Sequence, residues 1–244
     1  MSQKNPSASA RTETARSSAS RLAAARKSPG RLAILALVAV FTVIVAAVAI
    51  LAVSVTQGLE RGTAAADGAS VVRENSHVLG EASDGTVTLV EFLDFECEAC
   101  GAFYPYVEQF RAEYQGRITF VARYFPIPAH HNSRNAAVAV EAAAAQGKFE
   151  EMYRMMFETQ GAWGESQQDR SPLFRTYAEQ LGLDLAAYDA AVAAPETLAR
   201  VLQDYDEGVA LGVDSTPTFF LDGEKMTIES LDGFRAQLDA ALAE

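Results

Sequence analysis

The longest apolar run of the chain lies between residues 32 and 55 and reads LAILALVAVFTVIVAAVAILAVSV. Thr42 and Ser54 are its only polar residues, and it contains no charge, no Gly and no Pro. As an α-helix, a run of this length would extend about 36 Å, which exceeds the roughly 30 Å hydrocarbon core of a bilayer. The run therefore predicts a single transmembrane helix, with the globular part of the chain built from the residues after it.

The charges that flank this run predict which side of the membrane each end of the chain occupies. Residues 1–31 hold seven Lys or Arg residues against a single acidic residue, Glu13, whereas the first charge after the run is Glu60. Basic flanks stay in the cytoplasm, so we expect a single-pass protein of the cell membrane with residues 56 onward outside the cytoplasm. The basic segment is rich in Ser, Ala and Arg without apolar periodicity, which predicts a disordered cytoplasmic tail.

A cleaved signal peptide is the competing interpretation, with Ala64-Ala65-Ala66 as the cleavage site. However, the apolar run is longer than the roughly 7–15 residues of a signal peptide's apolar core, and Ala64 lies well beyond its end. We therefore favour a membrane anchor followed by a short linker over residues 56–70. Under both interpretations, the domain that follows the apolar run is exported.

The exported part is strongly acidic. Of the chain's 20 basic and 32 acidic residues, all but seven basic and one acidic residue lie after residue 31, so this part carries a net charge of −18. Proteins that bind nucleic acid neutralise phosphates with Lys and Arg. The composition therefore argues against a nucleic-acid partner and is typical of a solubilising surface.

The order of strand-like and helix-like segments predicts an α/β domain. Short β-branched and apolar runs predict strands, and apolar residues spaced three or four apart predict helices. We expect strands over residues 87–92, 118–125, 218–221 and 225–228, and helices over residues 97–114, 132–146, 149–158, 172–181, 185–193, 195–211 and 231–242. This order of β–α–β, a helical block and β–β–α fits one mixed sheet flanked by helices.

The chain has two cysteines, Cys97 and Cys100, placed three apart where a buried strand gives way to a helix. Outside the cytoplasm such a pair tends to form a disulfide. A zinc site needs about four ligands, and only His77, His130 and His131 are available to complete one. A structural disulfide is also disfavoured, because closing so short a loop removes little entropy from the unfolded chain. The spacing and its β–α–β context favour a redox-active Cys97–Cys100 disulfide, with no metal and no other cofactor.

The position of each cysteine predicts its role. Cys97 lies at the helix N-terminus, where unpaired N–H groups and the helix dipole favour an anion, so it is expected to be the attacking thiolate. Cys100, one turn further in, is expected to be the resolving thiol. The carboxylates of Glu96 and Glu98 oppose ionisation of Cys97, so the sequence leaves the redox potential open.

Glu91 stands in the middle of the apolar strand VTLVEF, six residues before Cys97. Burial would raise the pKa of its carboxyl group and suit it to exchange a proton with Cys100. The alternative is an outward-facing residue at the edge of the sheet. Thr216-Pro217 precedes the strand at residues 218–221, and this dipeptide alone indicates little.

Three segments in this order resemble DsbA-family thiol–disulfide oxidoreductases: VTLVEFLDFECEACGAFYPYVEQF, YFPIPAHHNSRNAAVAVEAAAAQGKFEEMYRMMF and VDSTPTFFLDG. The resemblance covers about residues 70–244 and is strongest to the membrane-tethered forms of Gram-positive bacteria. It implies a thioredoxin-like fold over residues 71–244, interrupted by an inserted helical domain at about residues 131–211.

The same resemblance implies roles for individual residues. Pro217 would be cis and lie against the disulfide, and Thr216 would offer its backbone to a bound peptide as an added strand. Cys97 would be the nucleophile, Cys100 the resolving cysteine and Glu91 the buried acid. The dipeptide Glu98-Ala99 departs from the Pro-His that is common in strong oxidants of the family.

The remaining candidates are aromatic or imidazole side chains. Phe95, two residues before Cys97, is expected near the substrate, whereas Trp163 is expected in the core. His130 and His131 could border the active-site groove, but we interpret them as polar residues at the start of a helix.

The resulting hypothesis is an oxidase that donates its disulfide to reduced or unfolded exported proteins. A membrane quinone-linked thiol oxidase would then reoxidise it. A membrane-anchored reductase or isomerase is the alternative among enzymes, and a peptide-binding chaperone module is the alternative from another class.

Overall fold

The computed structural model describes residues 69–83 and 87–243. The chain divides into two units, residues 1–55 and 56–244, and all described residues belong to the second unit. The predicted cytoplasmic tail, the transmembrane helix at 32–55 and nearly all of the linker lie outside the described residues. Within the part that the structure describes, no helix is long and apolar enough to cross a membrane.

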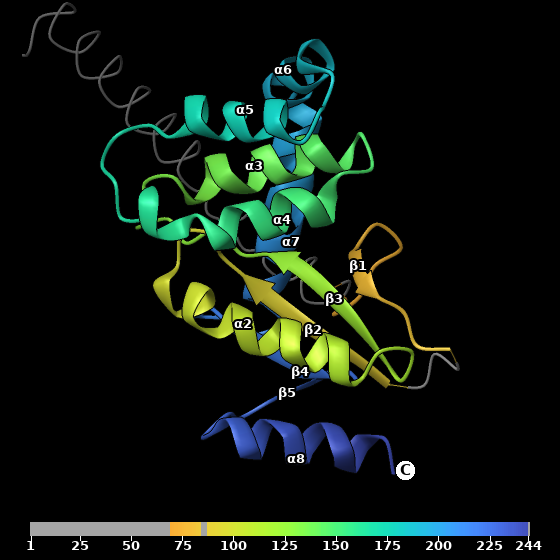
Figure 1. The fold of residues 1–244 in the computed structure, drawn as a ribbon. Helices are drawn as coiled ribbons and strands as arrows, with labels where there is room; N and C mark the ends of the chain where they lie inside the picture. Colours follow the sequence, from red (N-terminus) through yellow and green to blue (C-terminus); the bar gives the residue numbers. More distant parts are fainter. Residues whose placement is uncertain (1–68, 84–86, 244) are drawn as a thin grey trace, which may run out of the picture. The chain divides into compact units, whose positions relative to one another are not determined.

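A five-stranded mixed sheet forms the centre of the described domain (Figure 1). Its strands are β1 (His77–Gly80), β2 (Val87–Leu93), β3 (Ile118–Tyr124), β4 (Thr218–Leu221) and β5 (Glu224–Lys225). Their order across the sheet is β1-β3-β2-β4-β5. β2 and β3 are parallel, and the other three pairings are antiparallel. The central position of β2 excludes a sheet-edge location for Glu91.

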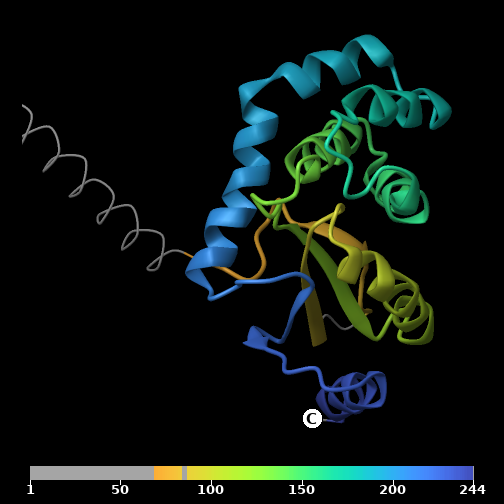
Figure 2. The same cartoon turned by 90° about the vertical axis from the view of Figure 1, so that its left-hand side faces the viewer.

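Helices cover both faces of this sheet and one of its ends. They are α2 (Glu98–Glu113), α3 (Ser133–Ala144), α4 (Phe149–Glu158), the 3-10 helix η1 (Gln160–Ala162), α5 (Ser171–Gln180), α6 (Leu185–Ala193), α7 (Pro195–Ala210) and α8 (Leu231–Ala241). α2 and α7 lie on opposite faces of the sheet, as Figures 1 and 2 show from two directions. The C-terminal ends of β2 and β3 point toward the inserted helices (Figure 1).

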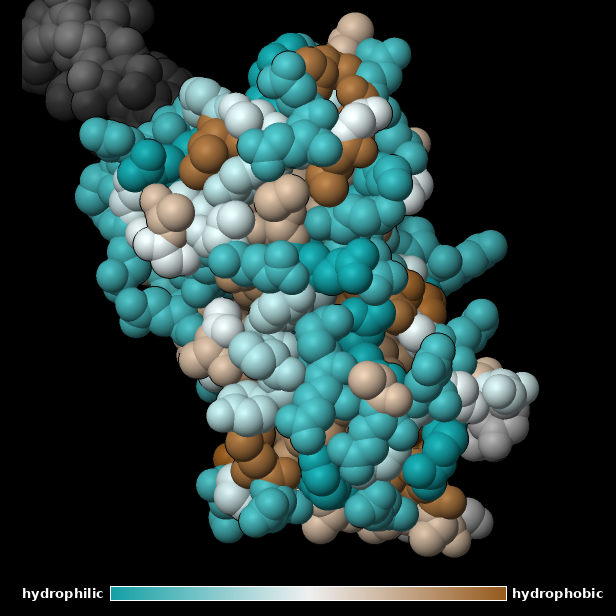
Figure 3. Space-filling view, in the orientation of Figure 1, coloured by the Kyte–Doolittle hydropathy of each residue, from teal (hydrophilic) through white to brown (hydrophobic). Residues whose placement is uncertain are grey.

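Alternation along β2 divides the core into two clusters, because successive side chains of a strand point to opposite faces. Val87, Leu89 and Leu93 belong to the larger cluster, which also contains buried residues of α2 and α8. Val90 and Phe92 belong to the smaller cluster on the other face. Glu91 therefore projects to the same face as Leu89 and Leu93. The molecular surface on the α2 side is mainly hydrophilic, with apolar side chains in small separate groups (Figure 3).

The structure confirms the predicted order of elements, with three differences. β1 was not predicted, because HVLG is only four residues long and its pairing with β3 is irregular between Val78 and Gly80. β5 covers two residues instead of the predicted 225–228. η1 occupies a segment predicted to be a loop. Asp222 and Gly223 form the tight turn between β4 and β5, and both residues have the positive φ of a hairpin turn.

Candidate active site

The two cysteines lie at the N-terminus of α2, immediately after the C-terminal end of β2. Cys97 is the N-cap residue and Cys100 is in the first turn. Cys97 keeps 8% of its surface exposed, whereas Cys100 is fully buried. Both are in the free thiol form. Of the two cysteines, only Cys97 therefore keeps surface that an outside molecule can contact.

The segment before β4 lies against the Cys97 thiol. The Thr216–Pro217 peptide bond is cis, as the resemblance implied. The Cys97 thiol donates a hydrogen bond to the carbonyl oxygen of Thr216, with 3.4 Å between Sγ and O. The Thr216 hydroxyl is buried and has no partner among the described residues. This hydroxyl is therefore available to donate to a thiolate at Cys97.

The surroundings of the two sulfur atoms shift their pKa values in opposite directions. The pKa of Cys97 is lowered to about 5, first by a hydrogen bond from the Cys100 thiol, against the opposing effect of burial. Thr216 and the backbone N–H groups of Ala99 and Cys100 lower it further. Burial, followed by the hydrogen bond to Cys97, raises the pKa of Cys100 well above its ordinary value. The hydrogen bonds that stabilise a Cys97 thiolate therefore outweigh the opposing effect of burial.

Glu91 lies on the central strand beneath this pair and is only 5% exposed. Burial raises the pKa of its carboxyl group to about 8, with smaller contributions from the charges of Glu108 and Cys97. Its charge in turn contributes to the raised pKa of Cys100. With this pKa, the carboxyl group of Glu91 is mostly protonated at pH 7.

Asp94 fixes the chain between β2 and α2, although sequence reasoning did not single it out. Its carboxylate accepts from the N–H of Glu96 at 2.8 Å and from the N–H of Ile127 at 3.0 Å. It also lies 2.6 Å from Nδ1 of His130. Asp94 therefore joins the segments that follow β2 and β3, immediately beside the cysteines.

Two further side chains attach this segment to the inserted helical domain. The buried Glu96 carboxylate accepts from the N–H of Asn132, at the start of α3. The amide of Gln160, in η1, donates to the carbonyl oxygens of Phe95 and Cys97, both at 2.8 Å. The inserted domain thus holds the backbone that carries the reactive cysteine.

A cavity of about 620 Å³ opens beside Cys97. Glu98 and Ala99 line it on the α2 side, and His130 and His131 line it from the loop after β3. Our interpretation of the two histidines as residues at the start of a helix is therefore incomplete. They border the active-site cavity because the C-terminal ends of parallel β2 and β3 meet at one edge of the sheet.

The structure corrects the prediction for Phe95. Its side chain is 1% exposed and its ring packs against Tyr124, Tyr153 and Phe157. Phe95 is therefore a core residue that presents no surface to a substrate. Trp163 is also fully buried, as predicted.

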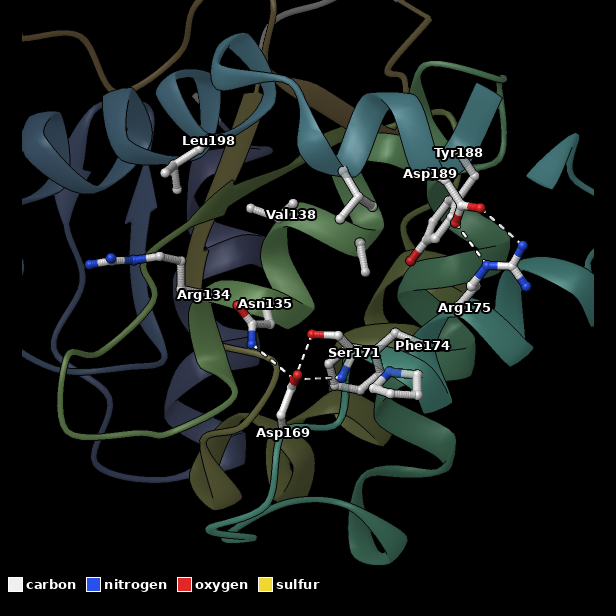
Figure 4. Close-up of a pocket in the computed structure, with 13 residues that line it drawn as sticks. Arg134, Asn135, Val138, Asp169, Ser171, Phe174, Arg175, Tyr188, Asp189 and Leu198 are labelled. Atoms are coloured by element: carbon white, nitrogen blue, oxygen red, sulfur yellow. Dashed lines mark hydrogen bonds and ion pairs between the residues drawn. The ribbon is translucent and has the colours of Figure 1, made fainter. Parts of the chain in front are cut away.

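A second cavity, of about 480 Å³, lies within the inserted domain (Figure 4). Its walls include the apolar side chains of Val138, Phe174 and Leu198, and the exposed Arg175–Asp189 ion pair lies at its margin. None of the predicted site residues lines it. Within the part of the chain that the structure describes, no cluster of His, Cys, Asp and Glu could hold a metal ion.

Asp94 and His130 could have been found in the sequence by their position. Each follows a predicted parallel strand at its C-terminal end, where polar side chains from neighbouring strands converge. Gln160 carries no such signal, because its contacts with the loop before α2 depend on how the inserted domain folds back.

The sequence profile of the family described as "Thioredoxin" matches residues 73–240. Among curated proteins, the Na(+)/H(+) antiporter NhaA 1 of Mycobacterium sp. (strain KMS) is 37% identical over 155 residues. This match covers 62% of the chain and 24% of the antiporter. The chain therefore spans about a quarter of the length of that relative.

Solved structures show the same fold. A thioredoxin-like oxidoreductase from Silicibacter pomeroyi DSS-3 is 26% identical, with a TM-score of 0.58 over 70% of this chain and 95% of that one. The α-DsbA1 of Wolbachia pipientis is 17% identical, with a TM-score of 0.59 over 70% of this chain and 93% of that one. The sheet, the cysteine-bearing helix and the inserted helices are therefore a DsbA-like arrangement.

Proposed function

We propose that this chain, which belongs to the thioredoxin family and is a thiol–disulfide oxidoreductase of the DsbA type, acts as an oxidase. It would donate the Cys97–Cys100 disulfide to reduced or unfolded exported proteins. The observation that carries the oxidative direction is the environment of Cys97, which lowers its pKa to about 5. Groups that stabilise the thiolate stabilise the reduced protein, and a stable reduced form makes the disulfide a stronger oxidant.

The reaction starts from the disulfide form. A substrate thiolate attacks Sγ of Cys97, the Cys97–Cys100 bond breaks, and the sulfur of Cys100 leaves as a thiolate. Because the pKa of Cys100 is well above its ordinary value, this sulfur takes up a proton, which protonated Glu91 can supply. A second substrate thiolate then attacks the substrate sulfur of the mixed disulfide and releases Cys97 as a thiolate. Two electrons pass to the protein, and the substrate gains one disulfide.

The segment at Thr216 offers a place for the substrate chain. Its carbonyl oxygen lies 3.4 Å from Sγ of Cys97, so a peptide paired with this backbone would place its own cysteine next to the reactive sulfur. Thr216 is 8% exposed, like Cys97 itself. Main-chain pairing of this kind tolerates many substrate sequences.

The remaining parts of the proposal concern location and partners. The apolar run at residues 32–55 and its basic flank support anchoring in the cell membrane, with the catalytic domain outside the cytoplasm. A membrane quinone-linked thiol oxidase is the partner that would accept the two electrons and restore the disulfide. In that exchange the Cys97 thiolate would attack a disulfide of the partner, and the Cys100 thiolate would then release the partner as a dithiol.

Equilibration of the full chain with glutathione tests the direction. A reduction potential of the Cys97–Cys100 couple near about −120 mV supports an oxidase, and one near about −270 mV supports a reductase. The Cys97→Ala/Cys100→Ala double variant is the control for activity that needs no redox chemistry. If this variant kept the activity toward reduced exported proteins, a peptide-binding chaperone module would replace the oxidase proposal.

A further inference from the structure

His130 is held beside the reactive cysteine by a buried carboxylate. Its Nδ1 lies 2.6 Å from Oδ2 of Asp94, whose side chain is fully buried. The His130 side chain keeps 31% of its surface exposed and lines the same cavity as Cys97. Nε2 has no hydrogen-bond partner among the described residues. One nitrogen of the ring is therefore anchored, while the ring lines the cavity that Cys97 also lines.

Acidic groups dominate the surroundings of this ring. The titratable groups that border the cavity or interact with His130 are Asp94, Glu96, Cys97, Glu98, His131 and Glu165. Four of the six are carboxylates, which oppose a thiolate at Cys97 and favour a protonated imidazole. Burial lowers the pKa of His130, but the hydrogen bond and charge of Asp94, together with the charges of Cys97 and Glu96, produce a net increase.

We propose that His130, held in place by Asp94, supplies the positive charge that supports the Cys97 thiolate. Asp94 orients the imidazole and favours its protonated form, and the ring offsets the carboxylates around the sulfur. His130 is thus a positioning residue that acts through Cys97. The positive charge comes from the loop after β3 and not from the Glu98-Ala99 dipeptide between the cysteines. The inference rests on the proposed function only in taking Cys97 as the attacking cysteine.

Reciprocity gives a test that needs no mutation. If protonated His130 stabilises the thiolate, the thiolate must stabilise protonated His130 by the same free energy. Histidine titrations followed by NMR on the full-length chain should therefore show a higher His130 pKa in the reduced protein than in the disulfide form. We expect a difference of about 0.5–1 unit, below the range for close, desolvated charge pairs. His77 on β1, which lies 2.6 Å from Glu141 of α3, is the reference histidine outside the cavity beside Cys97.

Substitution of His130 tests the same coupling through its effect on the Cys97 thiolate. In His130→Gln the pH midpoint for alkylation of Cys97 should rise by about 0.5–1 unit, and the equilibrium with glutathione should shift about three- to tenfold toward the disulfide form. His130→Lys, which restores a positive charge, should recover part of the loss. His131→Gln is the matched variant in the same loop and cavity, and it should move the midpoint less than half as far.

An unchanged His130 pKa on oxidation, or an unchanged alkylation midpoint in His130→Gln, would overturn the proposal. An equal effect of His131→Gln would also overturn it, because anchoring by Asp94 would then not matter. The alkylation midpoint reports the thiolate whether the enzyme oxidises or reduces its substrates. A failure of this inference is therefore distinguishable from a failure of the oxidase assignment.

Discussion

At the scale of single residues, the two sulfur atoms differ in the groups that surround them. The thiolate form of Cys97 is favoured first by the Cys100 thiol and then by the Thr216 side chain and the N–H groups of Cys100 and Ala99. Sγ of Cys100 is enclosed in the core and lies near the carboxyl group of Glu91, which favours a thiol. We therefore expect outside thiols to attack Cys97 and the Cys100 thiol to resolve the mixed disulfide.

This division predicts which single variant traps substrates. Resolution requires the second thiol, so Cys100→Ala should accumulate mixed disulfides with exported proteins, whereas Cys97→Ala should accumulate almost none. Non-reducing gels of cells that express each variant measure the difference. Equal trapping by both variants, or faster alkylation of Cys100 than of Cys97 in the reduced protein, would reverse the assigned roles.

Glu91 makes the stability of the reduced protein depend on pH. Its pKa rises from 4.5 to about 8 on folding, so ionisation destabilises the folded state progressively between these two pH values. Glu91→Gln should therefore have little effect below pH 4.5 and should stabilise the reduced protein by roughly 2–4 kcal/mol at pH 7. Urea unfolding at several pH values measures the change. If Glu91→Gln changed the free energy of unfolding by the same amount at every pH, the carboxyl group of Glu91 would be in contact with water.

The pKa shift of Cys97 predicts that stability changes with pH in the opposite direction, over nearly the same pH range. Its pKa falls from 9.0 to about 5 on folding, so its contribution to stability is complete above pH 9 and is lost as the pH falls to 5. Cys97→Ala should therefore destabilise the reduced protein by roughly 2–3 kcal/mol more at pH 7 than at pH 5. Because the Glu91 and Cys97 effects oppose each other, their combined contribution to the pH profile of the unsubstituted protein should be small. An equal effect of Cys97→Ala at pH 5 and pH 7, measured by urea unfolding, would show that the Cys97 pKa shift is absent.

The residues that sequence analysis could predict are those whose signal is local. The spacing of Cys97 and Cys100 and the acid within the strand VTLVEF are visible without any tertiary information. Phe95 shows the limit of such reasoning: its distance from Cys97 along the chain is short, but the sharp turn after β2 directs its ring into the core. Proximity in sequence to a reactive residue does not indicate which way a side chain points.

At the scale of elements, η1 and the first turn of α2 fit together through Gln160 and Gly101. A Cβ atom added at Gly101 would lie 2.0 Å from Oε1 of Gln160. The same Gln160 amide donates to the carbonyl oxygens of Phe95 and Cys97. Gly101 therefore leaves the space that Gln160 needs in order to hold the backbone at the active site.

This arrangement predicts a non-additive pair of substitutions. Gly101→Ala should displace the Gln160 amide from two carbonyl groups and destabilise the protein by about 1–3 kcal/mol. In a Gln160→Ala background the same change should be neutral or stabilising, because Ala favours a helix over Gly by roughly 0.5–1 kcal/mol. A double-mutant cycle of urea unfolding measures the coupling. Additive effects would show that the two side chains do not compete for this space.

The elements that sequence analysis predicted well are long or bounded by clear stop signals. α4, α6 and β4 have the predicted bounds, and α3 ends before Gly147, which has positive φ. β1 has no comparable signal: it is short, at the edge of the sheet, and defined only by its pairing with β3. Such a strand depends on tertiary contacts more than on its own residues.

At the scale of the whole described domain, the inserted helices do more than extend the fold. They hold three consecutive points of the segment before α2, through Glu96, Phe95 and Cys97. The presence of an inserted helical domain could be predicted, because the helical block interrupts the strand order. Its contacts with the active site could not, because they join residues more than thirty positions apart.

The orientation of the whole chain in the cell membrane is the last prediction. The basic flank of the apolar run should hold the N-terminus in the cytoplasm, so protease added to intact spheroplasts should degrade residues 56–244 while a cytoplasmic marker protein stays intact. Changing Arg21, Arg26, Lys27 and Arg31 to Ala is the matched control. In this variant, part of the chains should insert with the opposite orientation, and their domain should be protected from the protease. The reason is that the basic flank determines which end of the chain stays in the cytoplasm. Protection of the domain in the unsubstituted chain would contradict the topology. Recovery of a soluble domain that starts near Asp67 would instead establish the cleaved signal peptide, since an anchored chain stays with the membrane.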